Sequence, residues 1–460
     1  MAEKKTDLDR AVAALVAKGR PYGTLWNYYD GDQPLHYSTD RLREAFNTIN
    51  VRFIQNWCGV VVNTILDKLV LKRFVVGEDK KATKRLNELW WETEMKVDDD
   101  DVHLGMLVTG ESFAVVWREG AEGPIDAYYN DPRMCHIEYD EERPRVKSWA
   151  AKWWQTAEKR LRLTMYYPGK LEYYETTREI QDTMSLTGKA FEALDVVKNP
   201  FGMIPVFHFR RTRRGIYSEL TPSVVSLQDA VNKLLADMMV AAEYGAFKQR
   251  YIISNADTQG RLKNAPNEIW DLPAGDGFGQ DTSVGEFEAT DLGNYVGSIE
   301  KLATSIAATT QTPRHYFIEK AGSNPSGEAL MAMEASLNTK VDRYIERLQF
   351  DWSALAQFML RLDGVEVERQ AIETIFRDPR TLQPMTQAQA RNTNVAAGMP
   401  LRTVVREEGW SDDRIARMEA DRREELAAEQ AGLAEALLEQ QRRFDQGDPP
   451  PLAPPTEEGE

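Results

Sequence analysis

The residue types that most often carry catalysis are scattered along this chain and form no familiar catalytic motif. The histidines show neither the HExxH nor the HxH spacing of metal sites; they are His36, His103, His136, His208 and His315. No GxSxG nucleophile motif occurs, and Thr187-Gly188-Lys189-Ala190 matches only the end of a phosphate-binding loop. We therefore predict that the chain is not an enzyme and has no catalytic, cofactor-binding or metal-binding residues. A metal-dependent nuclease is the enzyme hypothesis that stays open, because 73 acidic residues make pairs of carboxylates inevitable.

Four consecutive aspartates, Asp98 to Asp101, predict a metal site only if further ligands converge on them. Acidic residues also favour the positive N-terminal end of a helix, so a helix start accounts for them without a metal. We favour that structural role. The two cysteines, Cys58 and Cys135, lack CxxC or metal-type spacing. We expect both to be buried free thiols in a reducing compartment.

A dense basic patch consists of Arg210, Arg211, Arg213 and Arg214. Such a cluster is typical of a phosphate-binding surface. A solvated surface or a salt-bridged contact between subunits also explains it, and we favour these two. The formal net charge of −16 argues against tight, sequence-independent binding to nucleic acid, which depends on cations that displace counterions from phosphates.

The N-terminal part of the chain predicts short helices and an irregular arm. Residues 1–10 lack the apolar core of a signal peptide, and no apolar run approaches the length of a bilayer span, so we expect a soluble intracellular protein. Apolar residues at helical spacing predict helices over 6–19, 50–68 and 80–95, with Gly19 ending the first. An aromatic cluster then predicts the irregular arm; it contains Tyr22, Trp26, Tyr28 and Tyr29.

From Ser112 the apolar residues alternate with polar ones, which predicts β-strands. The strand-like runs lie at 113–117, 125–129, 134–139, 146–154, 161–167 and 171–174. Turn residues between consecutive runs indicate an antiparallel sheet. Near the C-terminus we predict a strand-like segment at 365–367, a helix around Ile372, and helices over 386–397, 402–408 and 412–439. The segment 445–460 is rich in Gly, Pro and Glu and is predicted to be disordered.

The clearest helical period in the sequence is an apolar stripe with gaps of three and four residues. It consists of Leu330, Met333, Leu337, Val341, Tyr344, Leu348, Trp352, Leu355, Met359 and Leu362. Asn324-Pro325 supplies a start, Ser326 is an alternative cap, and Gly364 supplies the stop. At 1.5 Å per residue the helix would be roughly 55 Å long. Because a thin monomer cannot bury such a stripe, we expect neighbouring subunits to complete its core, and a closed head-to-tail contact makes a ring.

Two shorter helices precede the long one, at about 222–250 and 289–317, around a Gly-, Pro-, Asn- and Asp-rich insert at 251–288. A tight polar loop, 319–327, leads into the long helix. This order of segments resembles the stem, clip, stem, tunnel loop and tunnel helix of tailed-phage portal proteins, in the family grouped with the Bacillus phage SPP1 portal. Gly110-Glu111-Ser112-Phe113, Asn130-Asp131-Pro132 and Asn199 to Val206 are similar to parts of that family's wing domain. No motif among them is unique to the family.

The resemblance implies an α+β fold, with an antiparallel-sheet wing domain, two stem helices around a clip, a long tunnel helix and a small helical crown. The boundaries it implies are 1–221 for the wing with its helical N-terminal arm, 222–250 for the first stem helix, 251–288 for the clip, 289–317 for the second stem helix, 318–327 for the tunnel loop, 328–378 for the tunnel helix and the return to the wing, 379–444 for the crown and 445–460 for the tail.

The same resemblance implies a ring of about twelve subunits at one capsid vertex. Double-stranded DNA would pass through the ring during packaging and ejection. The implied partners are the large terminase, a head-completion or adaptor protein, and the major capsid and scaffolding proteins, with no membrane. The implied location is the virion, after assembly in the host cytoplasm.

The site residues implied by the resemblance fall into three groups. The tunnel loop would present Glu319, Lys320, Gly322, Ser323, Asn324 and Ser326 to the DNA, with Lys233 and Lys248 as further channel cations. Lys320 is either a phosphate contact or an ordinary exposed loop lysine. The clip would dock partners through Asp257, Arg261, Lys263, Glu268, Asp271 and Asp276. The basic patch would lie near the wing–stem junction and contact the capsid shell or packaged DNA.

A minor capsid or scaffolding-type structural protein is the alternative outside the portal family. Such a protein shares the size and acidity of this chain but needs no ring and no DNA channel. A closed ring with a central hole would separate the portal from this alternative and from the nuclease.

Overall fold

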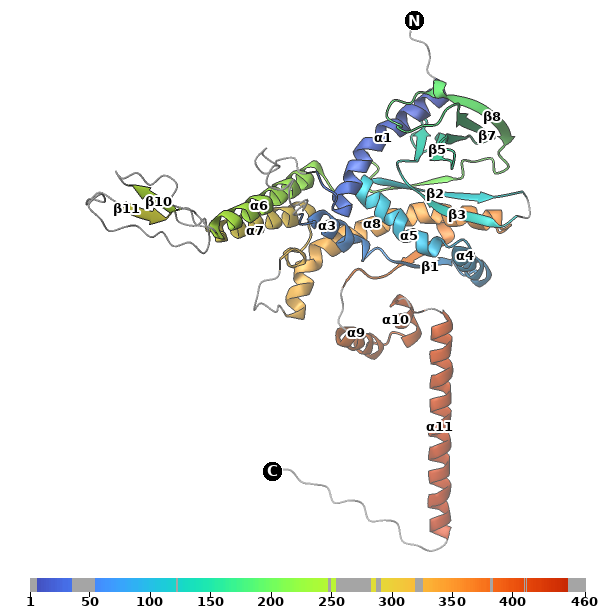
Figure 1. Cartoon of the computed structure of the whole chain (residues 1–460). Coiled ribbons are helices and arrows are strands. Elements are labelled where there is room, and N and C mark those ends of the chain that lie inside the picture. The colour runs from blue at the N-terminus through green and yellow to red at the C-terminus, as the bar shows by residue number, and fades with distance from the viewer. Residues whose placement is uncertain are drawn as a thin grey trace. The chain divides into compact units, whose positions relative to one another are not determined.

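The computed structural model describes residues 6–34, 54–120, 123–246, 250–253, 283–286, 291–318, 326–380, 384–408, 410 and 412–445. The chain divides into two compact units, Met1–Arg380 and Thr381–Glu460 (Figure 1). The first unit combines antiparallel sheets with helices, which confirms the predicted α+β class.

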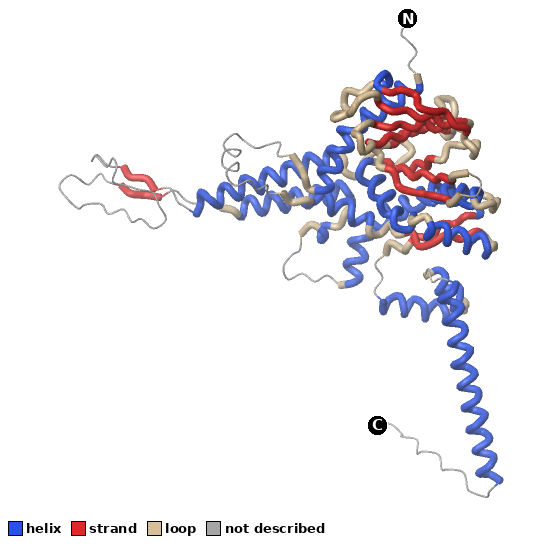
Figure 2. The backbone as a smooth tube through the Cα atoms, turned by 45° about the vertical axis from the view of Figure 1, so that its right-hand side comes forward, coloured by secondary structure: helices blue, strands red, loops and turns tan. Residues whose placement is uncertain are grey.

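Two antiparallel sheets, shown in red in Figure 2, lie in the first unit. The smaller sheet has the order β3-β2-β9, with β3 at Ile125–Asn130, β2 at Glu111–Arg118 and β9 at Val206–Arg210. The larger sheet runs in chain order through β4 (Cys135–Tyr139), β5 (Lys147–Gln155), β6 (Leu161–Tyr166), β7 (Lys170–Thr176) and β8 (Phe191–Lys198). All six predicted runs are strands. The edge strand β8, which follows a 3-10 turn at Gly188–Ala190, was not predicted because only its first residue is buried.

Alternation along the strands separates the side chains into distinct cores. On β5, Trp149 and Trp153 face the helix α1 (Asp7–Asp30), whereas Ala150 faces the smaller sheet. On β2, Phe113 belongs to the core between the sheets, and Ala114 belongs to the core beneath the smaller sheet. A strand with a period of two places successive side chains on opposite faces, so this layering follows directly from the sequence pattern.

The helix α1 is much longer than predicted. It begins at a capping box between Thr6 and Asp9, passes through Pro21, and ends at Gly31 with a left-handed φ of 84°. The predicted end at Gly19 and the irregular arm are therefore wrong. Tyr22 and Tyr28 are buried in this second half of the helix, so tertiary packing outweighs the weak helix propensity of its glycines and proline.

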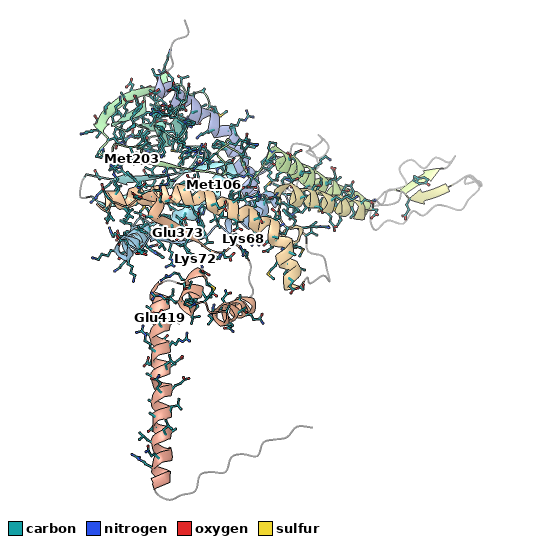
Figure 3. The ribbon with its side chains drawn as sticks, turned by 180° about the vertical axis from the view of Figure 1, so that it is seen from behind. Lys68, Lys72, Met106, Met203, Glu373 and Glu419 are labelled. Atoms are coloured by element: carbon teal, nitrogen blue, oxygen red, sulfur yellow. The ribbon has the colours of Figure 1, made fainter. Side chains whose placement is uncertain are left out.

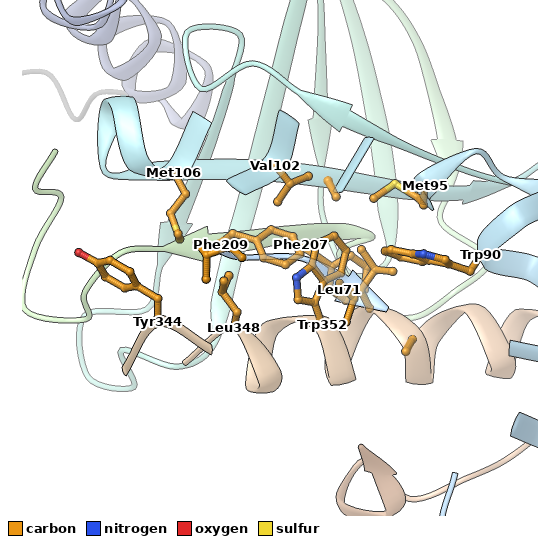
Figure 4. Packing of buried hydrophobic residues seen from close by; sticks show 14 of the residues in the cluster. Leu71, Trp90, Met95, Val102, Met106, Phe207, Phe209, Tyr344, Leu348 and Trp352 are labelled. Atoms are coloured by element: carbon orange, nitrogen blue, oxygen red, sulfur yellow. The ribbon is translucent and has the colours of Figure 1, made fainter. Parts of the chain in front are cut away.

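Beneath the smaller sheet lies the main core, shared by α5 (Met95–Thr109), α4 (Lys80–Glu92) and α8 (Gly327–Leu362). Trp352 of α8 is its centre: it packs edge-on against Trp90 at 5.1 Å between ring centroids, and its ring lies 4.4 Å from that of Phe209 (Figure 4). Aromatic pairs of this kind add to the apolar area that each ring buries. This core therefore packs the second half of α8 against the smaller sheet and the helices α4 and α5.

The predicted apolar stripe is present on the long helix α8, but most of the stripe is not covered by neighbouring subunits as expected. Most stripe residues are buried within this one chain; the buried members are Leu337, Val341, Tyr344, Leu348, Trp352, Leu355 and Met359. Met333 near the N-terminal end is exposed. The expectation that neighbouring subunits must complete the core is therefore wrong for most of the helix, because α4, α5 and the smaller sheet cover it.

Both ends of α8 are set by the residues around them. Ser326 is the N-cap, with its Oγ accepting a hydrogen bond of 3.3 Å from the backbone N–H of Ala329. Ser326, predicted as the alternative cap, is therefore the N-cap of α8. The predicted start with Pro325 at the first helical position is wrong, because the helix begins at Gly327. The chain leaves the helix through Gly364, whose φ of 86° suits glycine.

A small two-stranded sheet joins distant parts of the chain. β1 (Leu71–Val76) follows α3 (Trp57–Leu66) and pairs antiparallel with β12 (Ile372–Phe376), which contains Glu373 labelled in Figure 3. The helix predicted around Ile372 is therefore wrong. A 3-10 turn at Arg369–Ala371 precedes β12. Five residues are too few to distinguish a helical from an alternating pattern, so the pairing with β1 decides the conformation.

The second unit contains α9 (Pro384–Ala396), α10 (Leu401–Glu407) and α11 (Asp412–Asp445), which confirm the three predicted C-terminal helices. Arg391 of α9 pairs with Glu408 at 2.6 Å, which ties α9 to the end of α10. Of the predicted disordered tail, 445–460, Asp445 is the last residue of α11, and 446–460 lie outside the described residues. In neither unit is a described helix long and apolar enough to cross a membrane.

Candidate functional site

The two predicted stem helices lie side by side as α6 (Pro222–Ala246) and α7 (Gly293–Thr310) (Figures 1 and 2). Between them in the sequence, β10 (Arg250–Ile253) pairs antiparallel with β11 (Ser283–Glu286). The predicted clip residues at 257–276 lie outside the described residues, as does Lys248. A 3-10 turn at Arg314–Tyr316 follows α7 and leads towards the predicted tunnel loop.

The base of the stem is joined to the wing by an apolar contact and a buried amide network. Trp57 and Val61 of α3 pack on Val231 of α6 and Ile306 of α7. Gln228 of α6 accepts a 3.0 Å hydrogen bond from the backbone N–H of Trp57 and donates to the carbonyl of Gln55.

Further polar contacts extend this network. Asn232, one turn after Gln228, accepts a 3.2 Å bond from the backbone N–H of Gln55 and donates to Gln33. Tyr28 of α1 donates to Asp229 at 2.6 Å. Because buried amides must find partners, this network fixes the orientation of α6 relative to the wing.

A second junction ties the stem to α8 through one buried carboxylate, Glu219. Lys340 of α8 donates to Glu219 at 2.7 Å and to the carbonyl of Thr310, the last residue of α7, at 2.8 Å. Arg211 approaches the same carboxylate at 2.7 Å, and Tyr344 also donates to it. We call these five residues the Lys340 junction.

Electrostatics at the Lys340 junction keep Glu219 ionised. Burial alone would raise the pKa of this carboxyl, but Lys340 and Arg211 lower it below its usual value. Glu219 precedes α6, Thr310 ends α7, and Lys340 lies in α8, so one ion cluster connects all three helices. The stem and the long helix are thereby coupled within a single chain.

A third contact holds the N-terminal part of α8. Glu334 is buried and forms an ion pair with Lys68 at 3.1 Å, and Tyr316 donates to it at 2.9 Å. Lys68, labelled in Figure 3, also donates to the carbonyl of Pro379 at 2.8 Å. Tyr316 and Glu334 flank the predicted tunnel loop in the sequence, so both sides of the loop are anchored. Residues 319–325, which include Glu319, Lys320, Gly322, Ser323 and Asn324, lie outside the described residues.

Among the predicted channel cations, Lys233 is described and is not free. It forms an ion pair with Asp237 one turn further along α6. An exposed pair at this spacing on one helix face contributes a few tenths of a kcal/mol. Asp237 offsets the charge of Lys233, so the pair presents little net positive charge.

The predicted basic patch does not act as one surface. Arg211 is part of the Lys340 junction, whereas each of the other arginines lies over an aromatic ring: Arg210 over Tyr139, Arg213 over Phe350 and Arg214 over Tyr217. The exposed members Arg213 and Arg214 form no ion pair among the described residues. The sequence run therefore splits into two half-buried residues, Arg210 and Arg211, and two exposed cations, Arg213 and Arg214.

Three histidines and both cysteines are largely buried in the described part of the chain. Burial lowers the pKa values of His103 and His136 to about 3 and that of His208 to about 4, so these imidazoles are neutral at neutral pH. Burial raises the pKa of the Cys58 and Cys135 thiols to about 12, which confirms the expected burial of both cysteines. No group of three potential metal ligands is found in the described part of the chain. Asp98 to Asp101 lie in the first turns of α5, as expected for a helix start.

Sequence reasoning missed the charged residues that connect the stem to α8. Glu334 falls on the apolar stripe, three residues before Leu337, and Lys340 lies beside Val341. A charged residue on the buried face of a helix needs a partner, because burying an unpaired charge is costly. That position on the stripe could have identified Glu334, but neither the pattern nor the spacing identifies its partner Lys68.

A family model and two relatives agree on one family. Residues 20–428 match the family described as phage portal protein, SPP1 Gp6-like. The portal protein of Mycobacterium phage L5 is 24% identical over 455 residues, which cover 91% of this chain and 90% of that protein. The portal protein of Mycobacterium phage D29 is 24% identical over 404 residues, which cover 82% of this chain and 80% of that protein. A chain in the virion of a native gene transfer agent particle aligns with a TM-score of 0.47 and 13% identity over 85% of this chain and 96% of that chain.

Proposed function

Since the chain belongs to the SPP1 Gp6-like family of phage portal proteins, we propose that it forms a ring of about twelve subunits at one capsid vertex and conducts double-stranded DNA. In this proposal DNA passes through the ring during packaging and again during ejection. The ring assembles in the host cytoplasm with major capsid and scaffolding proteins and remains at the portal vertex of the virion.

The Lys340 junction is the observation that carries this proposal beyond the family match. When a packaging motor drives DNA through a conduit, the force on the outer part of the stem must be transmitted to the rest of each subunit. Lys340 bridges Glu219 and Thr310 with bonds of 2.7 and 2.8 Å, so α6, α7 and α8 respond as one element. The amide network at Gln228 joins the same stem to the wing.

We assign the DNA-facing role to the tunnel loop, with Lys320 as its main phosphate contact. Lys248 is a further channel cation, and Lys233 is a weaker one because Asp237 neutralises it. The acidic balance of the chain supports a weak, sliding contact, since strong attraction to phosphate would hold the duplex in place.

The Lys320 assignment is tested by Lys320→Ala. We expect normal rings but altered packaging or retention of DNA, measured as the fraction of nuclease-protected genome per particle. Lys189→Ala, at an exposed position on a 3-10 turn of the wing, is the matched control. Unchanged packaging and retention in Lys320→Ala would contradict its position in the channel.

We assign partner docking to the clip, where Asp257, Glu268, Asp271 and Asp276 outnumber Arg261 and Lys263. The terminase and later a head-completion protein would bind there in turn. Reversing the charge of Asp271 and Asp276 together should weaken terminase binding in a pull-down with assembled rings while leaving the rings intact. Equal recovery of terminase with both forms would contradict the assignment.

The C-terminal tail has no role in this proposal. Deleting residues 445–460 should leave ring formation unchanged, as measured by sedimentation velocity. Loss of rings after the deletion would show that the tail takes part in subunit contacts.

A further inference from the structure

The surface beside the middle of α8 carries positive charges that the chain itself does not neutralise. We call it the arginine patch; it consists of Lys147, Arg210, Arg213, Arg347 and Arg369. Arg347 and Asp351 lie one turn apart on α8, and the charges of Arg213, Arg210, Arg369 and Lys147 all act on Asp351. Among the described residues, no member of the patch forms an ion pair with a carboxylate. Four of these cations therefore act on one carboxylate, and Arg347 lies one turn before it, in a chain whose net charge is −16.

Each of these cations is held in place by neutral groups. Lys147 donates to the carbonyl of Val206 at 2.6 Å, and Arg347 donates to the carbonyl of Arg211 at 2.7 Å. Arg369 donates to the hydroxyl of Ser353 at 3.1 Å. Backbone and hydroxyl oxygens orient the side chains but leave their charges uncompensated.

The patch also exposes apolar surface. Phe350 lies under Arg213 and is 59% exposed, and Tyr217 lies under Arg214 and is 45% exposed. Arginine and aromatic residues together are typical of the centre of a protein–protein interface. A duplex backbone would gain little from exposed aromatic rings. The composition therefore favours an acidic protein surface as the partner.

A complementary surface exists on the same chain. We call it the acidic face; it runs from the end of α4 into the second turn of α5 and contains Glu94, Asp98, Asp100 and Asp101. None of these four carboxylates forms an ion pair within the described part of the chain. Burial and the charges of Asp98 and Asp100 raise the pKa of Asp101. Trp91 and Val97 add apolar surface to this face and are 69% and 71% exposed.

The two surfaces lie on different sides of α8. The helix α4 packs on α8 through Trp90 and Trp352, with their ring centroids 5.1 Å apart. Phe350 lies two residues before Trp352, which corresponds to about 200° around an α-helix. Phe350 in the arginine patch therefore faces away from α4, at whose end the acidic face begins. A second copy can bring the two surfaces together.

We propose that the arginine patch of one subunit docks on the acidic face of the next, as the head-to-tail contact between neighbouring copies. The contact is heterologous, as a closed ring requires. The charges pair across it, and Phe350 and Tyr217 meet Trp91 and Val97 at its centre. This inference rests on the proposed ring and specifies which surfaces form it.

Charge reversal tests the contact, with ring formation measured by sedimentation velocity over a range of concentrations. Arg213→Glu with Arg347→Glu reverses the patch at two exposed positions, and Asp100→Arg with Asp101→Arg reverses the acidic face. Each pair alone should raise the concentration of half-assembly at least tenfold, because like charges then meet across the contact. A chain carrying all four changes should assemble within threefold of the wild type. Mixed with the wild type, it should form separate rings.

The control reverses two exposed cations elsewhere, Arg178→Glu with Lys189→Glu, and should assemble like the wild type. Thermal unfolding of each variant at low protein concentration verifies that the subunit fold is retained. High salt should weaken wild-type assembly, since exposed charges are then screened within a few ångströms.

Three results would overturn the inference or its premise, and they are distinguishable. Normal assembly of both charge-reversed pairs would show that the two surfaces do not meet, with the ring itself intact. Normal assembly of the patch variant together with weaker binding of a short DNA duplex would assign the patch to nucleic acid instead. A wild-type chain that forms no rings at any concentration would contradict the proposed function itself.

Discussion

The Lys340 junction and the arginine patch both lie along α8, yet their charges are arranged in opposite ways. At the junction, Lys340 contacts Glu219 at 2.7 Å, Arg211 approaches the same carboxylate, and the pKa of Glu219 is lowered. In the patch, the charges of four cations act on Asp351, and no member of the patch forms an ion pair among the described residues.

Exposure distinguishes Glu219 of the junction, which is 3% exposed, from Arg213 and Arg347 of the patch, which lie on the surface. A charge removed from water must be paired within the chain, because an unpaired buried charge costs several kcal/mol. An exposed charge is stabilised by water and can remain unpaired until a partner arrives. The junction therefore builds the subunit, and the exposed surfaces are left for contacts between molecules.

Glu219→Gln should destabilise the subunit most. It leaves the buried Lys340 and Arg211 without their carboxylate, which should cost about 3–5 kcal/mol in the free energy of unfolding. Urea denaturation measures this loss. Glu346→Gln, at an exposed position on α8, is the control and should change stability by less than about 0.5 kcal/mol.

The same variant predicts a pH dependence. Because the pKa of Glu219 is lower in the folded state than its ordinary value of 4.5, its stabilisation is present above that value and is lost as the pH falls through the folded pKa. The difference between wild type and Glu219→Gln should therefore shrink in acid. A difference that stays constant from pH 7 to pH 3 would show that the carboxylate is not held by its cations.

Gln228→Leu should have the next largest effect, because it leaves the backbone N–H of Trp57 and the carbonyl of Gln55 without partners. Each unsatisfied buried group costs about 1–3 kcal/mol. Hydrogen exchange should show lost protection at the base of α6 and α7. Gln349→Leu, exposed on α8, serves as the control. Unchanged exchange in Gln228→Leu would contradict the role of the amide network.

Asp99→Asn should stabilise the protein by about 1–2 kcal/mol at pH 8 and have no effect at pH 4. Asp99 is 1% exposed, neither carboxylate oxygen has a hydrogen-bond partner, and burial raises its pKa to about 7. Between its ordinary value of 3.8 and pH 7 the native state holds a proton that the unfolded state lacks. Stability therefore falls as the pH rises through this window. The asparagine variant should lack that slope, and retention of the slope would assign it to another group.

Arg213→Gln should change the stability of the isolated subunit by less than about 0.5 kcal/mol, since an exposed cation without an ion pair contributes little. Arg211→Gln, two residues away, should cost several times more because Arg211 supports Glu219 and Tyr344. Thermal unfolding at low concentration compares the two. Equal losses of stability in the two variants would show that Arg211 of the junction and Arg213 of the patch do not differ in structural role.

Local patterns predicted most of the helices and strands, because apolar residues recur every two residues in a half-buried strand and every 3.6 residues in a helix, and either period can be recognised within one short segment. The strands β2 to β7 and the helix α8 are recognisable for that reason. The second half of α1 is not, since Pro21 and Gly23 obscure a helix that packing stabilises. β12 is not recognisable either, because its partner β1 lies about 300 residues earlier in the chain.

The site is harder to predict than the fold, because it depends on contacts between distant residues. Lys340 and Glu219 lie 121 residues apart, and Lys68 and Glu334 lie 266 apart. The run Arg210 to Arg214 predicted a basic patch, but the run alone does not show that Arg211 turns inward while Arg213 stays exposed. The roles of Lys320 and the clip residues remain predictions that functional experiments must test.

The most direct test of the proposed function is negative-stain electron microscopy of the purified protein with rotational class averages. We predict closed rings of about twelve subunits with a central hole wide enough for a DNA duplex. Monomers in every buffer, or assemblies without a central hole, would contradict the proposed DNA conduit.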